Sequence, residues 1–152
     1  MPSLESNSFG SITYQEDAVV EFPEGLPGFE ERRQFVALTL PHTQPLVFLQ
    51  SLDDAALCFI TLPVLSIDRQ YRLEIREEDL KIVGLSPKRQ PRIGEDVACM
   101  AVLTVQESGP TANLLAPIVI NIKNLKAVQA IAPDSGYSHQ HPLSPAGAMV
   151  CS

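Results

Sequence analysis

The sequence predicts an all-β fold, a small antiparallel β-barrel or sandwich with one or two short helices. Three observations support this class. Short runs of β-prone residues recur between turn signals along the 152-residue chain. Helical periodicity is scarce, and thirteen prolines, several beside these runs, interrupt the chain. With 45% hydrophobic residues, the chain is long enough to bury one core, so we expect a single domain.

The predicted strands follow one another with turn residues between them. They lie at residues 11–14, 18–22, 34–40, 46–52, 57–62, 71–76, 97–105, 118–122 and 126–131. Residues 71–76 alternate apolar and polar, which is typical of a strand with one face in solvent. Residues 97–105 do not alternate, which predicts a central strand covered on both faces, although a buried helix gives the same pattern.

One short helix is predicted at residues 77–83. Acidic residues open this run at the positive end of the helix dipole, apolar residues follow at helical spacing, and Gly84 can end the helix. From Pro133 onward Pro, Ser, Gly and His dominate, and the last residues are predicted to form a disordered tail.

Residues 22–29, with the sequence FPEGLPGF, predict a double turn. Pro27 and Gly28 fit the central pair of a type II turn, because proline fixes the negative φ of the first position and glycine tolerates the positive φ of the second. Pro23 and Gly25 fit the second and fourth positions of a type I turn. Such a rigid loop either presents contacts to a partner or is a well-made connection between strands.

Charge is distributed unevenly along the chain. The net charge is −7, and residues 1–62 hold nine acidic and two basic residues, whereas the remainder holds nine of each sign. The first part therefore either repels nucleic acid and attracts basic proteins or serves only solubility. The one basic loop, residues 88–92, has no interleaved aromatic residue, so no direct nucleic-acid binding is expected.

Neither a membrane segment nor a disulfide framework is indicated. No apolar run approaches the roughly 20 residues needed to cross a bilayer, and residues 1–10 do not resemble a signal peptide, so a cytoplasmic protein is expected. Cys58, Cys99 and Cys151 show no CxxC spacing and predict no zinc site. The first two lie in apolar runs and are interpreted as small core residues.

Residues that could support catalysis or bind metal form no convincing constellation. His42 lies in a predicted turn, and His139 and His141 lie near the tail. Asp53 and Asp54 are adjacent, so they point apart and are interpreted as a solvated turn. We therefore expect no catalytic residue, no metal and no cofactor, and a binding protein in place of an enzyme.

Several motifs in fixed order carry a family resemblance. They are residues 22–29, Leu49-Gln50-Ser51-Leu52, Phe59, Pro63, residues 113–121 with the sequence NLLAPIVIN, and Gln129. This succession resembles the FliW family of flagellar assembly factors over about residues 12–143, a span that includes Tyr71 and residues 137–143. On this basis the chain divides into an N-terminal extension at 1–11, a FliW-like β domain at 12–143 and a disordered tail at 144–152.

The resemblance implies a cytoplasmic, non-enzymatic protein that binds two partners, and we expect it to be monomeric alone. One is CsrA, a small dimeric RNA-binding repressor of translation, which family members antagonise allosterically. The other is newly made flagellin. Flagellin would occupy the factor until export removes it, after which the free factor would bind CsrA and relieve repression of flagellin synthesis.

Two groups of residues are assigned expected roles. The expected partner contacts are Glu24, Leu26, Phe29, Glu30, Glu31, Asp53 and Asp54. The residues expected to be structural are Phe22, Pro23, Gly25, Pro27, Gly28, Asn113 and Pro117, which would set the double turn and the start of a strand.

Two alternatives remain open at this stage. The first is a flagellin-specific chaperone that shields a flagellin segment and does not bind CsrA. The second is a small-molecule enzyme that uses the mouth of the barrel, for which the sequence offers no motif.

Overall fold

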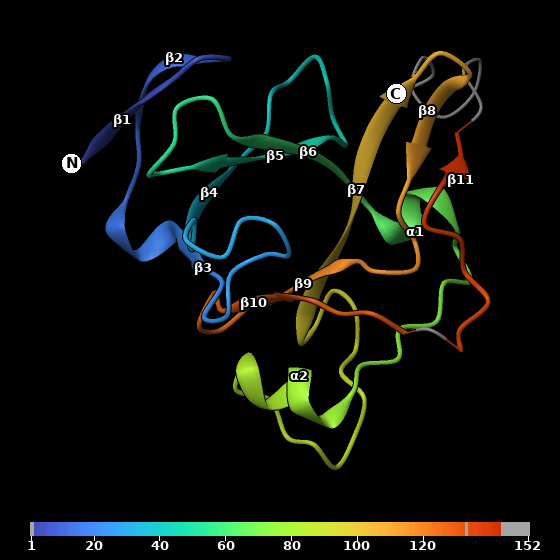
Figure 1. Ribbon diagram of the computed structural model, residues 1–152. Coiled ribbons are helices and arrows are strands. Elements are labelled where there is room, and N and C mark those ends of the chain that lie inside the picture. Colours follow the sequence, from blue (N-terminus) through green and yellow to red (C-terminus); the bar gives the residue numbers. More distant parts are fainter. Residues whose placement is uncertain (1, 133, 144–152) are drawn as a thin grey trace.

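Most of the regular secondary structure consists of antiparallel strands (Figure 1). The computed structural model describes residues 2–132 and 134–143, so the predicted tail at 144–152 lies outside the described residues. The strands are β1 (Ser3–Ser6), β2 (Gly10–Thr13), β3 (Val19–Glu21), β4 (Gln34–Leu38), β5 (Val47–Ser51), β6 (Cys58–Pro63), β7 (Val97–Gln106), β8 (Gly109–Ala112), β9 (Ile118–Asn121), β10 (Ala127–Gln129) and β11 (His141–Pro142). The helices are α1 (Val64–Ile67) and α2 (Glu77–Ile82), with a 3₁₀ turn at Glu16–Ala18.

Nine of the strands form one sheet. Its main path runs β10-β9-β7-β6-β5-β4-β3, with β8 added to β7 and β11 added to β8, while β1 and β2 form a separate hairpin. A bridge between Glu21 and Lys126 brings the two ends of the path together without closing a barrel. The layers are therefore sandwich-like, and the predicted all-β class with one or two short helices is confirmed.

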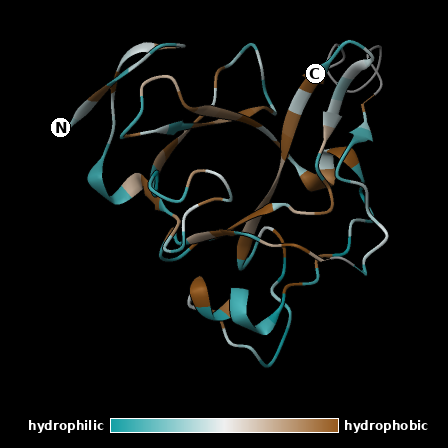
Figure 2. Cartoon of the chain, in the orientation of Figure 1, coloured by the Kyte–Doolittle hydropathy of each residue, from teal (hydrophilic) through white to brown (hydrophobic). Residues whose placement is uncertain are grey.

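Strand β7 separates two hydrophobic cores. Its side chains at Val97, Cys99 and Ala101 pack in the core that α2 covers, and Met100 packs in the core that the 22–33 loop covers. Successive strand residues point to opposite faces, so a strand buried on both faces shows no alternation in its sequence. Figure 2 shows hydrophobic residues along β7, whereas α2 carries both hydrophobic and hydrophilic residues.

The prediction that residues 97–105 are covered throughout is wrong at the far end of the strand. Thr104, Val105 and Gln106 are exposed. Val97–Met100 of β7 pair with β9 and Met100–Val102 pair with β6, but from Leu103 onward its only strand partner among the described residues is β8. This end of β7 lies outside the two cores.

The strand predicted at residues 71–76 does not form. The apolar residues of this segment point inward, as the alternation predicts. Its backbone, however, forms hydrogen bonds with side chains and not with a neighbouring strand. The Ile75 amide donates to Gln90 Oε1 (2.7 Å), and Gln90 Nε2 donates back to the Ile75 carbonyl (2.9 Å). The Arg72 amide donates to Tyr137 Oη (2.9 Å). Alternation predicts which face is buried, and it does not identify the hydrogen-bond partner.

Helix α2 forms as predicted, with three acidic residues in its first turn and Gly84 beyond its end at φ +77°. No local sequence pattern indicated β1, β8, β11 or α1. These elements are two to four residues long. Two of these strands contain a proline, which pattern analysis treats as a strand breaker.

A pair of stacked tyrosines attaches the C-terminal segment to the sheet. The rings of Tyr71 and Tyr137 stack with centroids 4.4 Å apart, and Tyr71 Oη donates to the Leu114 carbonyl (2.7 Å). Burial raises the pKa of Tyr71 above its usual value. Together with the β8–β11 pairing, these contacts hold residues 137–143 beside β8.

Candidate functional site

The 22–33 loop consists of consecutive tight turns. The Gly25 amide donates to the Phe22 carbonyl (2.9 Å), and the Phe29 amide donates to the Leu26 carbonyl (2.7 Å). Gly28 has φ +85°, the positive value that the type II prediction requires. Gly25 also has positive φ (+71°), and a Cβ built there would lie 2.6 Å from the Cα of Glu30. The backbone therefore folds so closely on itself that only glycine fits at this position.

Aromatic side chains attach this loop to the sheet. Phe22 is fully buried and meets Phe35 edge to face, with ring centroids 5.4 Å apart. Phe29, which is 41% exposed, meets Phe59 in the same way at 5.5 Å. One aromatic residue thus anchors the loop, and the other forms part of the surface.

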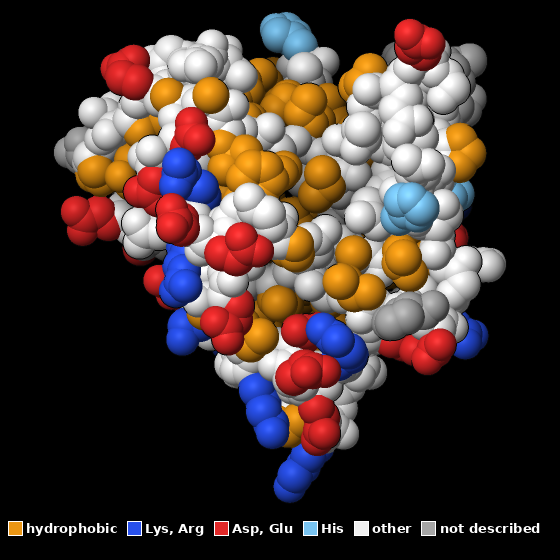
Figure 3. Space-filling view, in the orientation of Figure 1, with side chains coloured by type: hydrophobic (Ala, Val, Ile, Leu, Met, Phe, Trp, Pro, Cys, Tyr) orange, Lys and Arg blue, Asp and Glu red, His pale blue; other side chains and the backbone are white. Residues whose placement is uncertain are grey.

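A groove of about 290 Å³ lies between this loop and the sheet. Its apolar lining comes from the loop (Leu26 and Phe29) and from three strands (Phe59, Val102 and Ile118). Leu26 was expected to contact a partner, but it is only 4% exposed. Its side chain is part of the core and also lines the groove. In Figure 3 hydrophobic side chains form a band across the middle of the molecule, beside a group of acidic side chains.

Carboxamides lie around the same groove, at Gln106, Asn113, Gln129 and Gln140, with His139. Two of them also support the fold. Asn113 Oδ1 accepts from the Leu115 and Ala116 amides (3.1 and 2.9 Å). Gln129 Nε2 donates to the Ala116 carbonyl (3.0 Å). Asn113 therefore shapes the turn before β9 and also lines the groove.

A second hollow of about 430 Å³, which we call the acidic pocket, includes Phe29 and the four charged residues Glu30, Glu31, Arg32 and Asp54. Glu30 Oε2 accepts from the Gly28 amide (2.9 Å), and this bond lowers the pKa of Glu30. Arg32 lies 3.6 Å from Asp54 and 3.8 Å from Glu31. Three carboxylates and one guanidinium leave the pocket negative.

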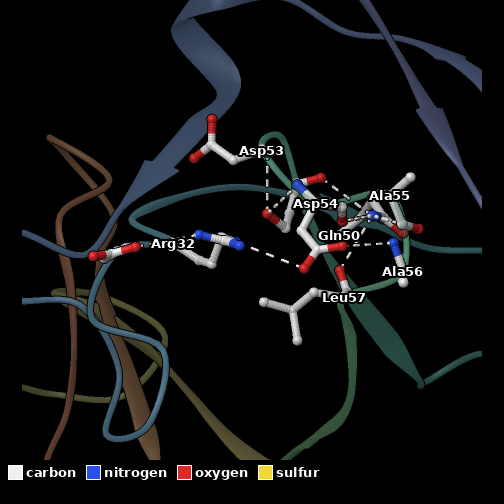
Figure 4. A network of polar contacts seen from close by, with 9 residues as sticks. Arg32, Gln50, Asp53, Asp54, Ala55, Ala56 and Leu57 are labelled. Carbon is white, nitrogen blue, oxygen red and sulfur yellow. Dashed lines mark hydrogen bonds and ion pairs between the residues drawn. The ribbon is translucent and has the colours of Figure 1, made fainter.

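Gln50 organises the turn that holds Asp53 and Asp54 (Figure 4). It is fully buried, and its Nε2 lies within 3.2 Å of the carbonyls of Ser51, Asp54 and Leu57. Its Oε1 accepts from the hydroxyl of Ser6 in β1 (2.7 Å). One side chain thus satisfies several turn carbonyls and joins the turn to the N-terminal hairpin.

The structure brings some of the expected contact residues together and separates others. Phe29, Glu30, Glu31 and Asp54 line the acidic pocket, while Glu24 and Asp53 lie outside both hollows. The groove-lining residues from β7 and from residues 139–140 were not predicted from the sequence. Val102 lies in an apolar run that indicated only a core strand, and the others are polar residues in exposed segments that no periodic signal distinguished from ordinary surface.

Groups suited to catalysis do not gather in the described part of the chain. Within residues 2–132 and 134–143, no three His, Cys, Asp or Glu side chains are placed to hold a metal ion. Burial raises the pKa of Cys99 to about 12 and also raises that of Cys58, so both thiols stay protonated at neutral pH.

None of the helices in this part of the chain has the length and hydropathy of a membrane-spanning segment.

Fold and site together define a small β-sheet protein with a groove of mixed apolar and amide character beside an acidic pocket. The FliW protein family matches residues 3–143, and the chain belongs to this family of flagellar assembly factors. The match includes β1, within the eleven residues interpreted as an extension.

Individual relatives agree with this assignment over nearly their whole length. The flagellar assembly factor FliW of Bacillus pumilus (strain SAFR-032) is 35% identical over 142 residues, 92% of this chain and 94% of that protein. The protein of the same name from Thermosipho africanus (strain TCF52B) is 36% identical over 141 residues, 89% and 91% of the two chains. A crystal structure of the flagellar assembly factor FliW has a TM-score of 0.82 at 33% identity and covers 96% of this chain and 99% of that one.

Replacing Gly25 and Gly28 separately by Ala tests the geometry of the loop. Gly28→Ala adds only the strain of a positive φ, because no atom beyond its own chain neighbours lies within 4 Å of its Cβ position, and we expect a loss of about 1 kcal/mol in unfolding free energy. Gly25→Ala adds the overlap with the Glu30 backbone, for a total of roughly 2 to 5 kcal/mol. Urea denaturation measures both, and equal losses would contradict the close approach at Gly25.

Gln50→Glu tests the buried amide. At pH 7 a carboxylate would face several carbonyls, so burial should raise its pKa well above the usual value of about 4.3. The neutral acid would be favoured in the folded state, and the variant should approach wild-type stability near pH 4. Stability should fall as pH rises, with a loss of roughly 3 kcal/mol or more at pH 7. A pH-independent difference from wild type in denaturation experiments would show that the side chain ionises freely in solvent.

Proposed function

We propose that this protein is a cytoplasmic, monomeric regulator that binds CsrA and flagellin and thereby couples flagellin synthesis to export. The observation that carries the proposal is the family match over residues 3–143. Flagellin holds the protein until export removes it, and the released protein then binds CsrA and lowers its affinity for flagellin mRNA. If this coupling is allosteric, bound RNA weakens CsrA binding to this protein by the same factor.

The surface supports binding of a basic protein and does not favour nucleic acid. The acidic pocket and the exposed acids Glu24 and Asp53 come from two loops near each other in space, joined by the Arg32–Asp54 ion pair. A negative field of this kind repels phosphate and speeds encounter with a basic partner. Family motifs distant in sequence, including Phe29, Asn113 and Gln129, meet at the groove beside it.

A flagellin-specific chaperone without CsrA activity is the second candidate. The groove favours it, because an apolar lining with amides can shield a segment of a newly made chain. The two candidates differ in one measurement, the binding of CsrA.

Calorimetry and gel shifts make that measurement. We expect the purified protein to bind CsrA with measurable heat and to release a flagellin leader RNA from CsrA at micromolar concentration. Flagellin added first should prevent this release. If flagellin binds while CsrA gives no heat and its RNA complexes persist, the chaperone candidate replaces the regulator. If neither protein binds, the proposal is wrong.

Acid-to-amide variants test electrostatic recognition. Glu30 and Asp54 also accept hydrogen bonds from the backbone of their own loops, so the variant Glu24→Gln, Glu31→Gln, Asp53→Asn removes three charges without changing these bonds. Its association with CsrA should be slower by roughly fivefold at low salt, with dissociation little changed, because long-range attraction acts on encounter.

The matched control removes three exposed acids outside the groove and the acidic pocket, Glu74→Gln, Glu77→Gln, Asp134→Asn, which gives the same net charge. We expect its association rate to stay near that of wild type in stopped-flow measurements. Equal slowing in both triple variants would show that Glu24, Glu31 and Asp53 affect association only through the net charge, and the interface would then lie elsewhere.

A further inference from the structure

We propose that the groove and the acidic pocket form one docking surface for a peptide segment that carries two apolar side chains and an adjacent Lys or Arg. The inference rests on the proposed function insofar as that function is the binding of other proteins. It adds where on this molecule a partner segment lies and what chemistry that segment has.

Phe29 makes the two hollows continuous. It lines both, is 41% exposed, and is fixed by its edge-to-face contact with Phe59 and by the turn hydrogen bond to Leu26. A side chain in the groove and a side chain in the acidic pocket would therefore contact the same ring. Because consecutive tight turns hold this ring, little ordering entropy is lost when a partner binds.

The lining of the groove favours apolar side chains with polar backbone around them. Residues of the Asp, Glu, Lys and Arg types do not line it among the described residues. Its volume of about 290 Å³ lies at the lower limit for pockets that enclose small molecules, and it suits one or two side chains better than a cofactor. The amides of Gln106 and Gln140 offer both donors and acceptors, which can pair with a peptide backbone.

The net negative charge of the acidic pocket favours binding of a cationic side chain. Arg32 is partly neutralised by Asp54 and Glu31. Among the described residues Glu30 has no ion-pair partner, and its side chain accepts hydrogen bonds only from backbone amides of its own loop. A carboxylate has capacity for more than one hydrogen bond, so Glu30 can also receive a Lys or Arg from a partner. The segment that fits both hollows is therefore apolar at one end and basic at the other.

Strand β7 supplies a matched pair of variants for the test. Thr104 lines the groove, whereas its neighbour Val105 is 78% exposed and points to the opposite face of the strand. Thr104→Lys and Val105→Lys add the same charge at adjacent positions of the same strand. Only Thr104→Lys places the charge in the groove. A difference in peptide binding between the two variants therefore comes from the groove and not from the change in net charge.

The probe is a displayed library of random 12-residue peptides selected on the full-length wild-type protein. We expect enriched peptides to share two apolar positions next to one Lys or Arg. Fluorescence anisotropy on a synthesised winner should show binding at least tenfold weaker to Thr104→Lys and within twofold of wild type to Val105→Lys.

A second comparison tests the acidic pocket. Changing the basic residue of the winning peptide to Met should weaken binding to wild type roughly fivefold or more, and should change binding to Glu30→Gln by less than twofold. The Gln side chain can still accept from the Gly28 amide, so the turn is kept. Glu77→Gln is the control and should behave as wild type.

The inference is overturned if no peptide is enriched, if the enriched peptides bind both Lys variants equally, or if the peptide substitution costs the same in wild type and in Glu30→Gln. The library contains neither CsrA nor flagellin as a whole protein. If the groove binds these peptides while both proteins fail to bind, the proposed function is refuted and this inference stands. If CsrA and flagellin bind while no peptide is enriched, this inference is refuted and the proposed function stands.

Discussion

Burial of β7 on both faces is the constraint on which the rest of the structure depends. Val97, Cys99 and Ala101 need a covering layer on one side, which α2 and the segments around it provide, and Met100 needs one on the other, which the 22–33 loop provides. The loop is thus a covering layer as well as a surface feature. Its inner residues, Phe22 and Leu26, exclude water from a core, and its outer residues are presented by the same rigid backbone.

The candidate surface is preorganised because the same loop covers a core and presents the surface groups. Gly25 approaches Glu30 closely, Phe29 rests on Phe59, and the neighbouring acidic turn is held by the buried amide of Gln50. Each contact that positions a surface group is also a contact that stabilises the fold. A partner that docked there would lose little free energy in ordering this surface, so its affinity would depend mainly on complementarity.

Features that depend on local chemistry could be predicted from the sequence. The positive φ of Gly28, the helix at Glu77–Ile82 and the strands with strong β propensity follow from residue types that favour one backbone geometry. Prediction failed where long-range pairing decides. Residues 71–76 have the pattern of a strand, but Gln90 satisfies their backbone. The groove is made of residues from the 22–33 loop, β6, β7 and the chain after β8, and their proximity could not be derived from any local pattern.

The stacked tyrosines give this protein an unusual optical property. The chain has no Trp and only three Tyr, two of which lie face to face with centroids 4.4 Å apart. Its near-ultraviolet circular dichroism is therefore dominated by tyrosine, and the coupled pair contributes a signal that exists only while Tyr137 rests on Tyr71. Since His139 and Gln140 at the edge of the groove follow Tyr137 closely in the chain, a spectrum can report without any label whether occupation of the groove leaves the C-terminal segment in place.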